Sequence, residues 1–172
     1  GNYNPSRGAN LKPNAYGMIV GNQSERRNDI VNGRVDLQFN ICKGLTFTSS
    51  NGVDYLNNTN YGLGVKAVDI THNNNNMYNN NTQRTLLQTT NNLTYVGSWN
   101  KHNLTATGVW EATKSTTTAM NINGRDLINE GVGWWNVNNA KVITAGNSYS
   151  NWALLSGVAR VMYNYGDKYM LT

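Results

Sequence analysis

Residues 151–172, NWALLSGVARVMYNYGDKYMLT, decide the fold. Read in steps of two, this stretch has one small or apolar face that ends in tyrosines and a second face that becomes polar at Arg160 and Asn164. Such alternation is typical of a β-strand, because successive side chains point to opposite faces. Gly166 and Asp167 then predict a tight turn into another strand. The first strand exceeds the usual ~5–6 residues, and it is long enough to cross a membrane, for which a tilted strand needs ~9–11.

The composition favours an all-β fold. Only 13% of the 172 residues are charged, against ~25% in ordinary soluble domains. Asn, Thr, Ser and Gln supply the polarity instead, and mean hydropathy is −0.57. Asn, Thr and Gly are poor helix formers, and no long window places apolar residues at helical spacing. No run of 18 apolar residues predicts a transmembrane helix.

A second hairpin is predicted in residues 30–55. Residues 30–41 alternate between an apolar face and a strictly polar face, Lys43 and Gly44 make a tight turn, and the chain returns with the same period. A soluble sandwich strand can show this pattern, but the length and the strictly polar second face favour a barrel wall. The apolar face of the first strand comprises Val31, Gly33, Val35, Leu37, Phe39 and Ile41.

The remaining strands and loops complete an asymmetric pattern. Residues 84–96 and 103–113 form a third hairpin around a short turn, whereas long polar loops are expected at 1–27, 57–82 and 114–150. Short turns at one end of the strands and long loops at the other are typical of outer-membrane barrels. The predicted fold is therefore all-β: a segment of a transmembrane antiparallel up-and-down β-barrel with short periplasmic turns and long extracellular loops.

Side-chain alternation also assigns candidate site residues. Aromatic residues beside the short turns form an interfacial girdle: Tyr95, Trp99, Tyr163, Tyr165 and Tyr169. Polar and charged residues predicted to face the lumen or a plug are Arg34, Asp36, Gln38, Asp54, Arg84, Glu111 and Arg160. A register slip of one residue would reverse every one of these faces. Trp134 and Trp135 lie in a predicted extracellular loop, where they either pack within the loop, stack on a substrate or contact a partner.

The sequence gives no sign of catalysis or of a bound cofactor. Cys42 is the single cysteine, so no internal disulfide forms. His72 has no cluster of ligands at metal-binding spacing. No nucleophile triad or phosphate-binding loop stands out, and Asp54 with Glu111 is the one carboxylate pair considered for glycoside hydrolysis. The net charge of +5 is scattered along the chain rather than set in an aromatic-interleaved stripe, which argues against nucleic acid.

The final hairpin resembles a recurring motif of the SusC/RagA family of TonB-dependent outer-membrane receptors. Two shorter turn segments, at 42–46 and 101–104, are also similar to that family. The departures are Gly157 and Ala159 in the strand and the Asn-rich stretch at 57–82. The matching residues of the hairpin are Leu154, Leu155, Ser156, Arg160, Val161, Tyr163, Tyr165, Asp167, Lys168, Tyr169, Leu171 and Thr172.

This resemblance implies active import of oligosaccharides, other glycans or peptides across the outer membrane of Bacteroidetes-type bacteria. It implies a large barrel in outer-membrane lipid with an N-terminal plug, energy from the TonB complex, and a SusD-like surface lipoprotein as a lid. Residues 1–172 are then a partial barrel of five to six strands, and the plug, the TonB-contacting region and the remaining strands lie outside them. Open edges are not tolerated in lipid, so the segment needs the rest of its barrel.

Two other interpretations stay open from the sequence. A soluble β-sandwich that binds carbohydrate through Trp134 and Trp135 is the first. A passive porin-like barrel is the second, because its wall strands show the same alternation.

Overall fold

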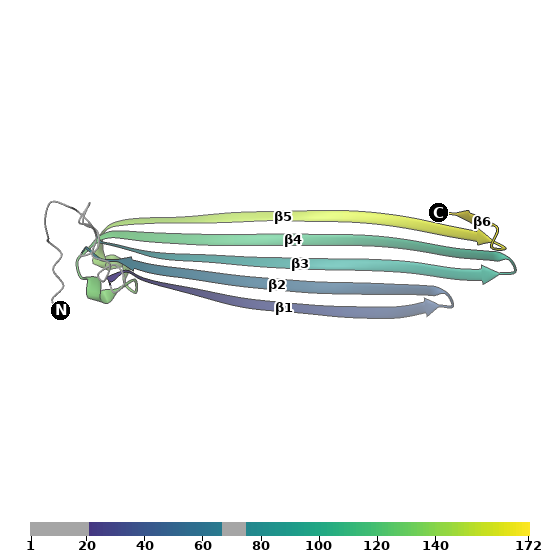
Figure 1. The fold of residues 1–172 in the computed structure, drawn as a ribbon, viewed down its shortest axis with the longest axis horizontal. Helices are drawn as coiled ribbons and strands as arrows, with labels where there is room; N and C mark the ends of the chain where they lie inside the picture. Colours follow the sequence, from purple (N-terminus) through teal and green to yellow (C-terminus); the bar gives the residue numbers. More distant parts are fainter. Residues whose placement is uncertain (1–20, 67–74) are drawn as a thin grey trace. The chain divides into compact units, whose positions relative to one another are not determined.

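The computed structural model describes residues 21–66 and 75–172 and confirms the all-β prediction (Figure 1). The strands form one six-stranded antiparallel sheet in the order β1-β2-β3-β4-β5-β6, so each strand pairs with its neighbours in sequence. This order is the predicted up-and-down topology. No helix in the described residues is long and apolar enough to span a membrane. The strands are β1 (Gln23–Cys42), β2 (Leu45–Gly64), β3 (Asn76–Trp99), β4 (His102–Leu127), β5 (Ala140–Tyr165) and β6 (Tyr169–Leu171).

The three short turns form where they were predicted. A two-residue turn at Lys43 and Gly44 joins β1 to β2, and Gly44 has φ +84°, a conformation that glycine adopts without a steric penalty. Asn100, at φ +52°, opens the turn between β3 and β4. In the turn before β6, Asp167 has φ +58°, and its side chain and backbone N–H both bond to the Asn164 side chain, at 2.7 and 3.0 Å. Asn and Asp tolerate this region better than other side chains, which explains their use here.

The predicted extents of the long loops are wrong, because the strands continue far into the Asn-rich segments. Residues 57–64 belong to β2, 76–82 to β3, 114–127 to β4 and 140–150 to β5. Of the segment predicted as loop at 1–27, residues 23–27 belong to β1. His72 lies outside the described residues, as do residues 1–20 of the segment predicted as loop.

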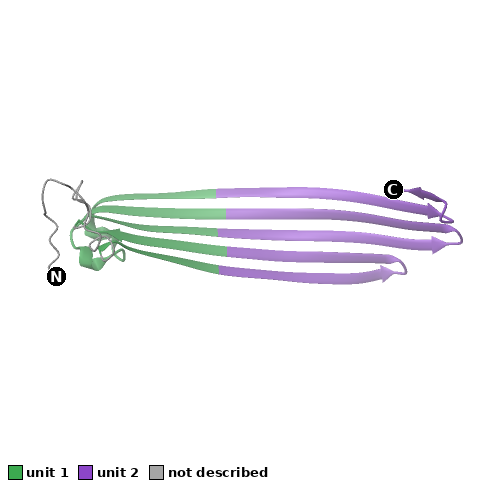
Figure 2. Ribbon diagram, viewed as in Figure 1, with its two compact units in different colours: residues 1–29, 56–83, 117–149 green, residues 30–55, 84–116, 150–172 purple. Residues whose placement is uncertain are grey.

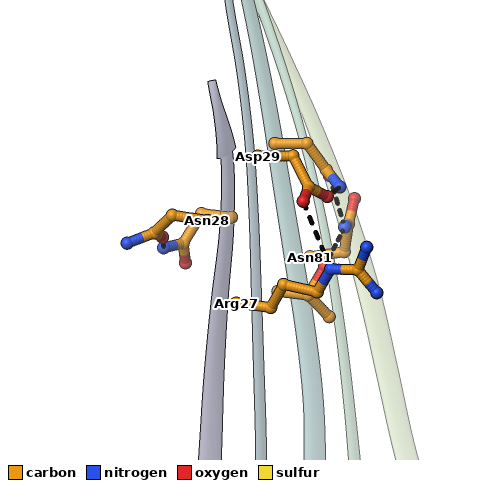
Figure 3. Close-up of polar contacts among 7 residues, drawn as sticks. Arg27, Asn28, Asp29 and Asn81 are labelled. Carbon is orange, nitrogen blue, oxygen red and sulfur yellow. Dashed lines mark hydrogen bonds and ion pairs between the residues drawn. The ribbon is translucent and has the colours of Figure 1, made fainter. Parts of the chain in front are cut away.

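Polar cross-strand pairs hold these extensions together, and they explain why an alternation search misses them. The Asn81 amide donates to the side-chain oxygens of Asn57, at 2.8 Å, and of Thr59, at 3.0 Å. The Asn57 amide in turn donates to Asp29 at 3.2 Å, and Asp29 pairs with Arg27 at 3.2 Å (Figure 3). The bonds from Asn57 and Arg27 hold the pKa of the Asp29 carboxyl below its usual range. Side-chain amides thus take the place that apolar pairs hold elsewhere in a sheet.

The chain divides into two units, which are best described separately (Figure 2). Unit 1 comprises residues 1–29, 56–83 and 117–149, and unit 2 comprises residues 30–55, 84–116 and 150–172. The three short turns belong to unit 2, and the segment between β4 and β5 belongs to unit 1.

The buried apolar residues of the described chain all lie in unit 1. They form a small core, and three partly buried side chains pack against it. In unit 2 many large apolar residues of the sheet are exposed, as Val31 at 60% and Val35 at 59% illustrate. The core residues are Leu63, Met77, Leu127 and Ala140, with Val65, Trp134 and Val137 packed against them.

Candidate functional site

A polar patch in unit 2 brings together hydrophilic side chains from four strands, β1 to β4. Arg34 of β1 donates to Asp36 at 2.9 Å and to the Ser50 hydroxyl of β2 at 3.1 Å. On the neighbouring strands, the Gln88 amide donates to the Glu111 carboxylate at 2.6 Å. We call Arg34, Asp36, Ser50, Gln88, Thr90 and Glu111 the polar patch.

A small cavity links the two halves of the polar patch. It measures about 150 Å³ and is lined by Arg34, Ser50, Gly52, Gln88 and Thr90. Alternation predicts a shared face for Arg34, Asp36 and Glu111; in the structure Arg34 pairs with Asp36 on β1, and Glu111 on β4 contacts Gln88 on β3. A guanidinium, two carboxylates, an amide and hydroxyls offer donors and acceptors of both charge signs, which suits binding by hydrogen bonds and ion pairs. Whether the patch faces a lumen or a plug stays a prediction.

The other predicted lumenal residues lie on separate strands of the same unit. Gln38, Asp54, Arg84 and Arg160 are on β1, β2, β3 and β5, and each is exposed. The side chains of Gln38, Arg84 and Arg160 make no hydrogen bond or ion pair with another described residue. The structure therefore does not bring these three into the polar patch, and their role stays a prediction.

An aromatic stack lies among the apolar residues of unit 2. The ring centroids of Phe39 and Phe47 are 6.4 Å apart, and those of Phe47 and Trp110 are 5.9 Å apart, with interplanar angles of 23° and 27°. The three residues come from β1, β2 and β4. The sequence places Phe39 on the apolar face of its strand but shows no register between strands, so the stack itself was not predicted.

Three of the predicted girdle residues, Trp99, Tyr163 and Tyr165, gather around His102, a residue at the predicted turn between 96 and 103. The His102 ring lies 5.7 Å from Trp99 and 4.9 Å from Tyr165, and its Nδ1 bonds to the Tyr163 hydroxyl at 2.6 Å. Its position in the sequence could have indicated the contact with Trp99, because the two residues flank the two-residue turn between β3 and β4. The other two predicted members lie apart from this ring contact: Tyr169 pairs with Tyr165 in the β5–β6 ladder, and Tyr95 lies beside Gly44 and Gly97.

The two tryptophans of the segment between β4 and β5 have different surroundings. Trp134 stacks on Tyr61 with centroids 6.1 Å apart and packs against the core of unit 1. Trp135 is 73% exposed, although its ring lies 5.6 Å from Tyr61 and 6.0 Å from Trp134. Packing thus accounts for Trp134, and contact with a substrate or partner stays a prediction for Trp135. Tyr61 was missed because it fell within a predicted loop.

Asparagine side chains order the segment that carries these tryptophans. Asn129 and Asn136 cap the short 3-10 turns Glu130–Val132 and Val137–Asn139 by accepting from the backbone N–H two residues on, at 2.9 and 3.1 Å. Asn75 is 2% exposed and bonds to both backbone groups of Leu127. Its amide also donates to Glu130 at 2.8 Å. The segment is therefore a packed structure with its own hydrogen bonds rather than a free loop.

Within residues 21–66 and 75–172, no group of three or more His, Cys, Asp or Glu side chains is placed to hold a metal ion. Cys42 is exposed. Of the carboxylate pair considered for glycoside hydrolysis, Glu111 on β4 accepts a hydrogen bond from Gln88, and Asp54 lies on β2.

Comparison with known proteins gives structural matches only. No protein-family model and no curated protein sequence matches the chain. The RagAB peptide transporter matches over 89% of this chain with a TM-score of 0.77 and 18% identity. The RagAB peptide importer matches in its open-open state over 89%, with a TM-score of 0.76, and in its closed-closed state over 86%, with a TM-score of 0.75, both at 18% identity.

These matches concern the fold alone, because the identity is low. In each case the chain spans 17% of the length of the solved chain. The sheet therefore has the architecture of a segment of those transporter chains.

Proposed function

We propose that this chain is part of the wall of a SusC-like outer-membrane barrel that imports nutrients with energy from the TonB complex. The observation that carries the proposal is the match of the six-stranded sheet to RagAB transporter chains over 89% of its residues at a TM-score of 0.77. The similar hairpin motif at residues 153–172 adds sequence support. A SusD-like lipoprotein lid is part of this proposal, as is location in the bacterial outer membrane.

The exposed apolar residues of unit 2 support a membrane setting. Ile41 is 59% exposed and Leu37 is 46% exposed, although both belong to a strand in the sheet. A soluble sandwich covers such a face with a second sheet, but the described residues form one sheet only. Lipid chains provide the missing apolar cover on the barrel interpretation. The strand portions in unit 2 are then the membrane-crossing segments.

Peptides are the substrate class we favour over oligosaccharides. The matched structures are described as a peptide transporter and a peptide importer. The polar patch also presents a guanidinium beside carboxylates, Arg34 with Asp36 and Glu111 nearby on β4, which suits a substrate carrying both charge signs. Oligosaccharides remain the competing class, and Trp135 is the exposed ring that would contact them.

Uptake by cells carrying the full-length protein tests this proposal. We expect loss of the gene to abolish uptake of labelled peptides, and loss of the TonB complex to do the same. Arg34→Ala should reduce uptake because it removes the cation of the polar patch, whereas Gln38→Ala should not, because the Gln38 side chain makes no hydrogen bond or ion pair with a described residue. Peptide uptake that persists without TonB would favour the passive porin-like barrel and refute active import.

A further inference from the structure

The short turns of unit 2 carry a concentration of positive charge. Each of the three turns contains one exposed lysine: Lys43, Lys101 and Lys168. Asp167 is the single carboxylate within these turns, and the Asn164 amide donates to it at 2.7 Å. The cations of the turns therefore outnumber the carboxylates beside them.

One of these lysines borders a cavity that has no carboxylate in its lining. The cavity measures about 520 Å³ and is lined by Asn100, Lys101, His102 and Tyr165. Lys101 makes no ion pair with a carboxylate of the described chain. An ammonium, an amide, an imidazole and a phenol thus surround one space, and all four carry N–H or O–H donors.

Packing fixes these donors in place. The backbone N–H of Gly166 donates to the Lys101 carbonyl at 2.7 Å, and the aliphatic stem of Lys101 lies against Gly166. His102 is half-buried between Trp99 and Tyr165, and its Nδ1 is bonded to Tyr163. When the Tyr163 hydroxyl donates to Nδ1, the Nε2 of His102 carries the hydrogen, and Nε2 makes no other bond to a described residue.

We propose that this cavity binds the phosphate group of a membrane glycerophospholipid, with Lys101 supplying the charge and His102 and Asn100 supplying hydrogen bonds. The chemistry follows from one ammonium and several neutral N–H and O–H donors around a space whose lining has no carboxylate, because phosphate oxygens are anionic hydrogen-bond acceptors. The aromatic rings of Trp99 and Tyr165 beside it are the residue types that sit at headgroup depth. The lipid source rests on the proposed membrane location, whereas the anion preference rests on the cavity alone.

Native mass spectrometry of the full-length protein in detergent tests this site. Delipidated protein is titrated with phosphatidylglycerol, and the bound fraction is compared for wild type, Lys101→Gln and Lys101→Arg. Removing one cation near an anionic lipid weakens binding by about fivefold, so we expect that loss in Lys101→Gln and near-normal binding in Lys101→Arg. Lys141→Gln is the matched control, because Lys141 is an exposed lysine of unit 1 and belongs to none of the three turns.

Two results would overturn the lipid assignment. Equal binding by wild type and Lys101→Gln would show that the cavity does not hold the lipid. Displacement of phosphatidylglycerol by millimolar inorganic phosphate would show a site for free anions instead. An unchanged unfolding temperature of Lys101→Gln excludes loss of fold as the cause of weaker binding. Lipid binding is measured without any uptake assay, so it can be interpreted even if the import proposal fails. A protein that stays in solution without detergent would refute the membrane location itself.

Discussion

Replacing Asn75 should release the segment between β4 and β5 without disturbing the rest of the sheet. The Asn75 side chain is buried, and it donates to the Leu127 carbonyl at 3.0 Å and accepts from the Leu127 N–H. It also donates to Glu130 at 2.8 Å, and the same Glu130 oxygen accepts from the Lys66 N–H at 2.9 Å. The Asn75 side chain therefore links the connection between β2 and β3 to the connection between β4 and β5.

The magnitude follows from the groups that Asn75→Ala leaves unpaired. Leu127 is 4% exposed, so its N–H and its carbonyl would both be buried without a partner. Each such group costs about 1–3 kcal/mol, and the pair therefore costs about 2–6 kcal/mol. The lower figure corresponds to roughly 30-fold faster exchange of the local amides, because each 1.36 kcal/mol is a factor of ten.

Hydrogen exchange followed by mass spectrometry measures this effect on peptides covering residues 124–139. We expect faster exchange there in Asn75→Ala and unchanged exchange in peptides of unit 2. Asn76→Ala is the matched control, since Asn76 is exposed and bonds to no described residue through its side chain. Exchange in residues 124–139 that is the same for Asn75→Ala and wild type would refute the argument that Asn75 holds the segment.

Three further substitutions test local features of the fold. The pKa of Asp29 is lowered in the folded state, so its ionised form stabilises the fold at pH values above the usual aspartate pKa, and this stabilisation is lost as the pH falls through the lowered pKa. Thermal melting curves at several pH values should show that Asp29→Asn loses this dependence on acid. Identical pH profiles for the variant and the wild type would contradict this expectation. Phe47→Ala removes the middle ring of two stacked pairs and should lower the free energy of unfolding in urea by about 1–3 kcal/mol. Ser49→Ala is the control, and an equal loss of stability in that variant would argue against a role for the stack. Gly44→Ala places a Cβ 2.2 Å from the backbone oxygen of Val96, at a residue with φ +84°, and should reduce the folded fraction on a heat-modifiability gel. Gly108→Ala is the control and should not reduce it, because there is open space around the Cβ at that position. Equal folded fractions for the two variants would refute the argument from the close approach.

The fold class was predictable because unit 2 follows simple rules. Period-two alternation in residues 30–41 identified a strand with two distinct faces, and glycine in the turns at Gly44 and Gly166 marked the hairpins. The turn positions and the order of the strands followed from these local signals.

The extensions of the strands were not predictable by the same rule. Asn57 and Asn81 read as loop residues, since asparagine is depleted in strands. In the structure they pair with each other and with Asp29 across three strands, which depends on a register that the sequence does not show. Local propensity was overridden by cross-strand hydrogen bonds.

The candidate site was predictable in part for a similar reason. Alternation grouped Arg34 with Asp36 on one face, and both belong to the polar patch. It could not reveal that Ser50 and Gln88 complete the patch, nor that His102 is the centre of the aromatic cluster, because those contacts join different strands. Trp134 and Trp135 are adjacent in sequence, and only the packed core distinguishes the half-buried ring from the exposed one.

Purification of the native protein from the outer-membrane fraction tests the central claim most directly. The measurement is the intact mass in detergent, together with the identity of chains that copurify. The barrel account predicts a membrane-extracted species much larger than the 19.1 kDa of these residues, with a surface lipoprotein bound to it. A stable 19.1 kDa species that stays in solution without detergent would contradict the account and favour the soluble carbohydrate-binding sandwich.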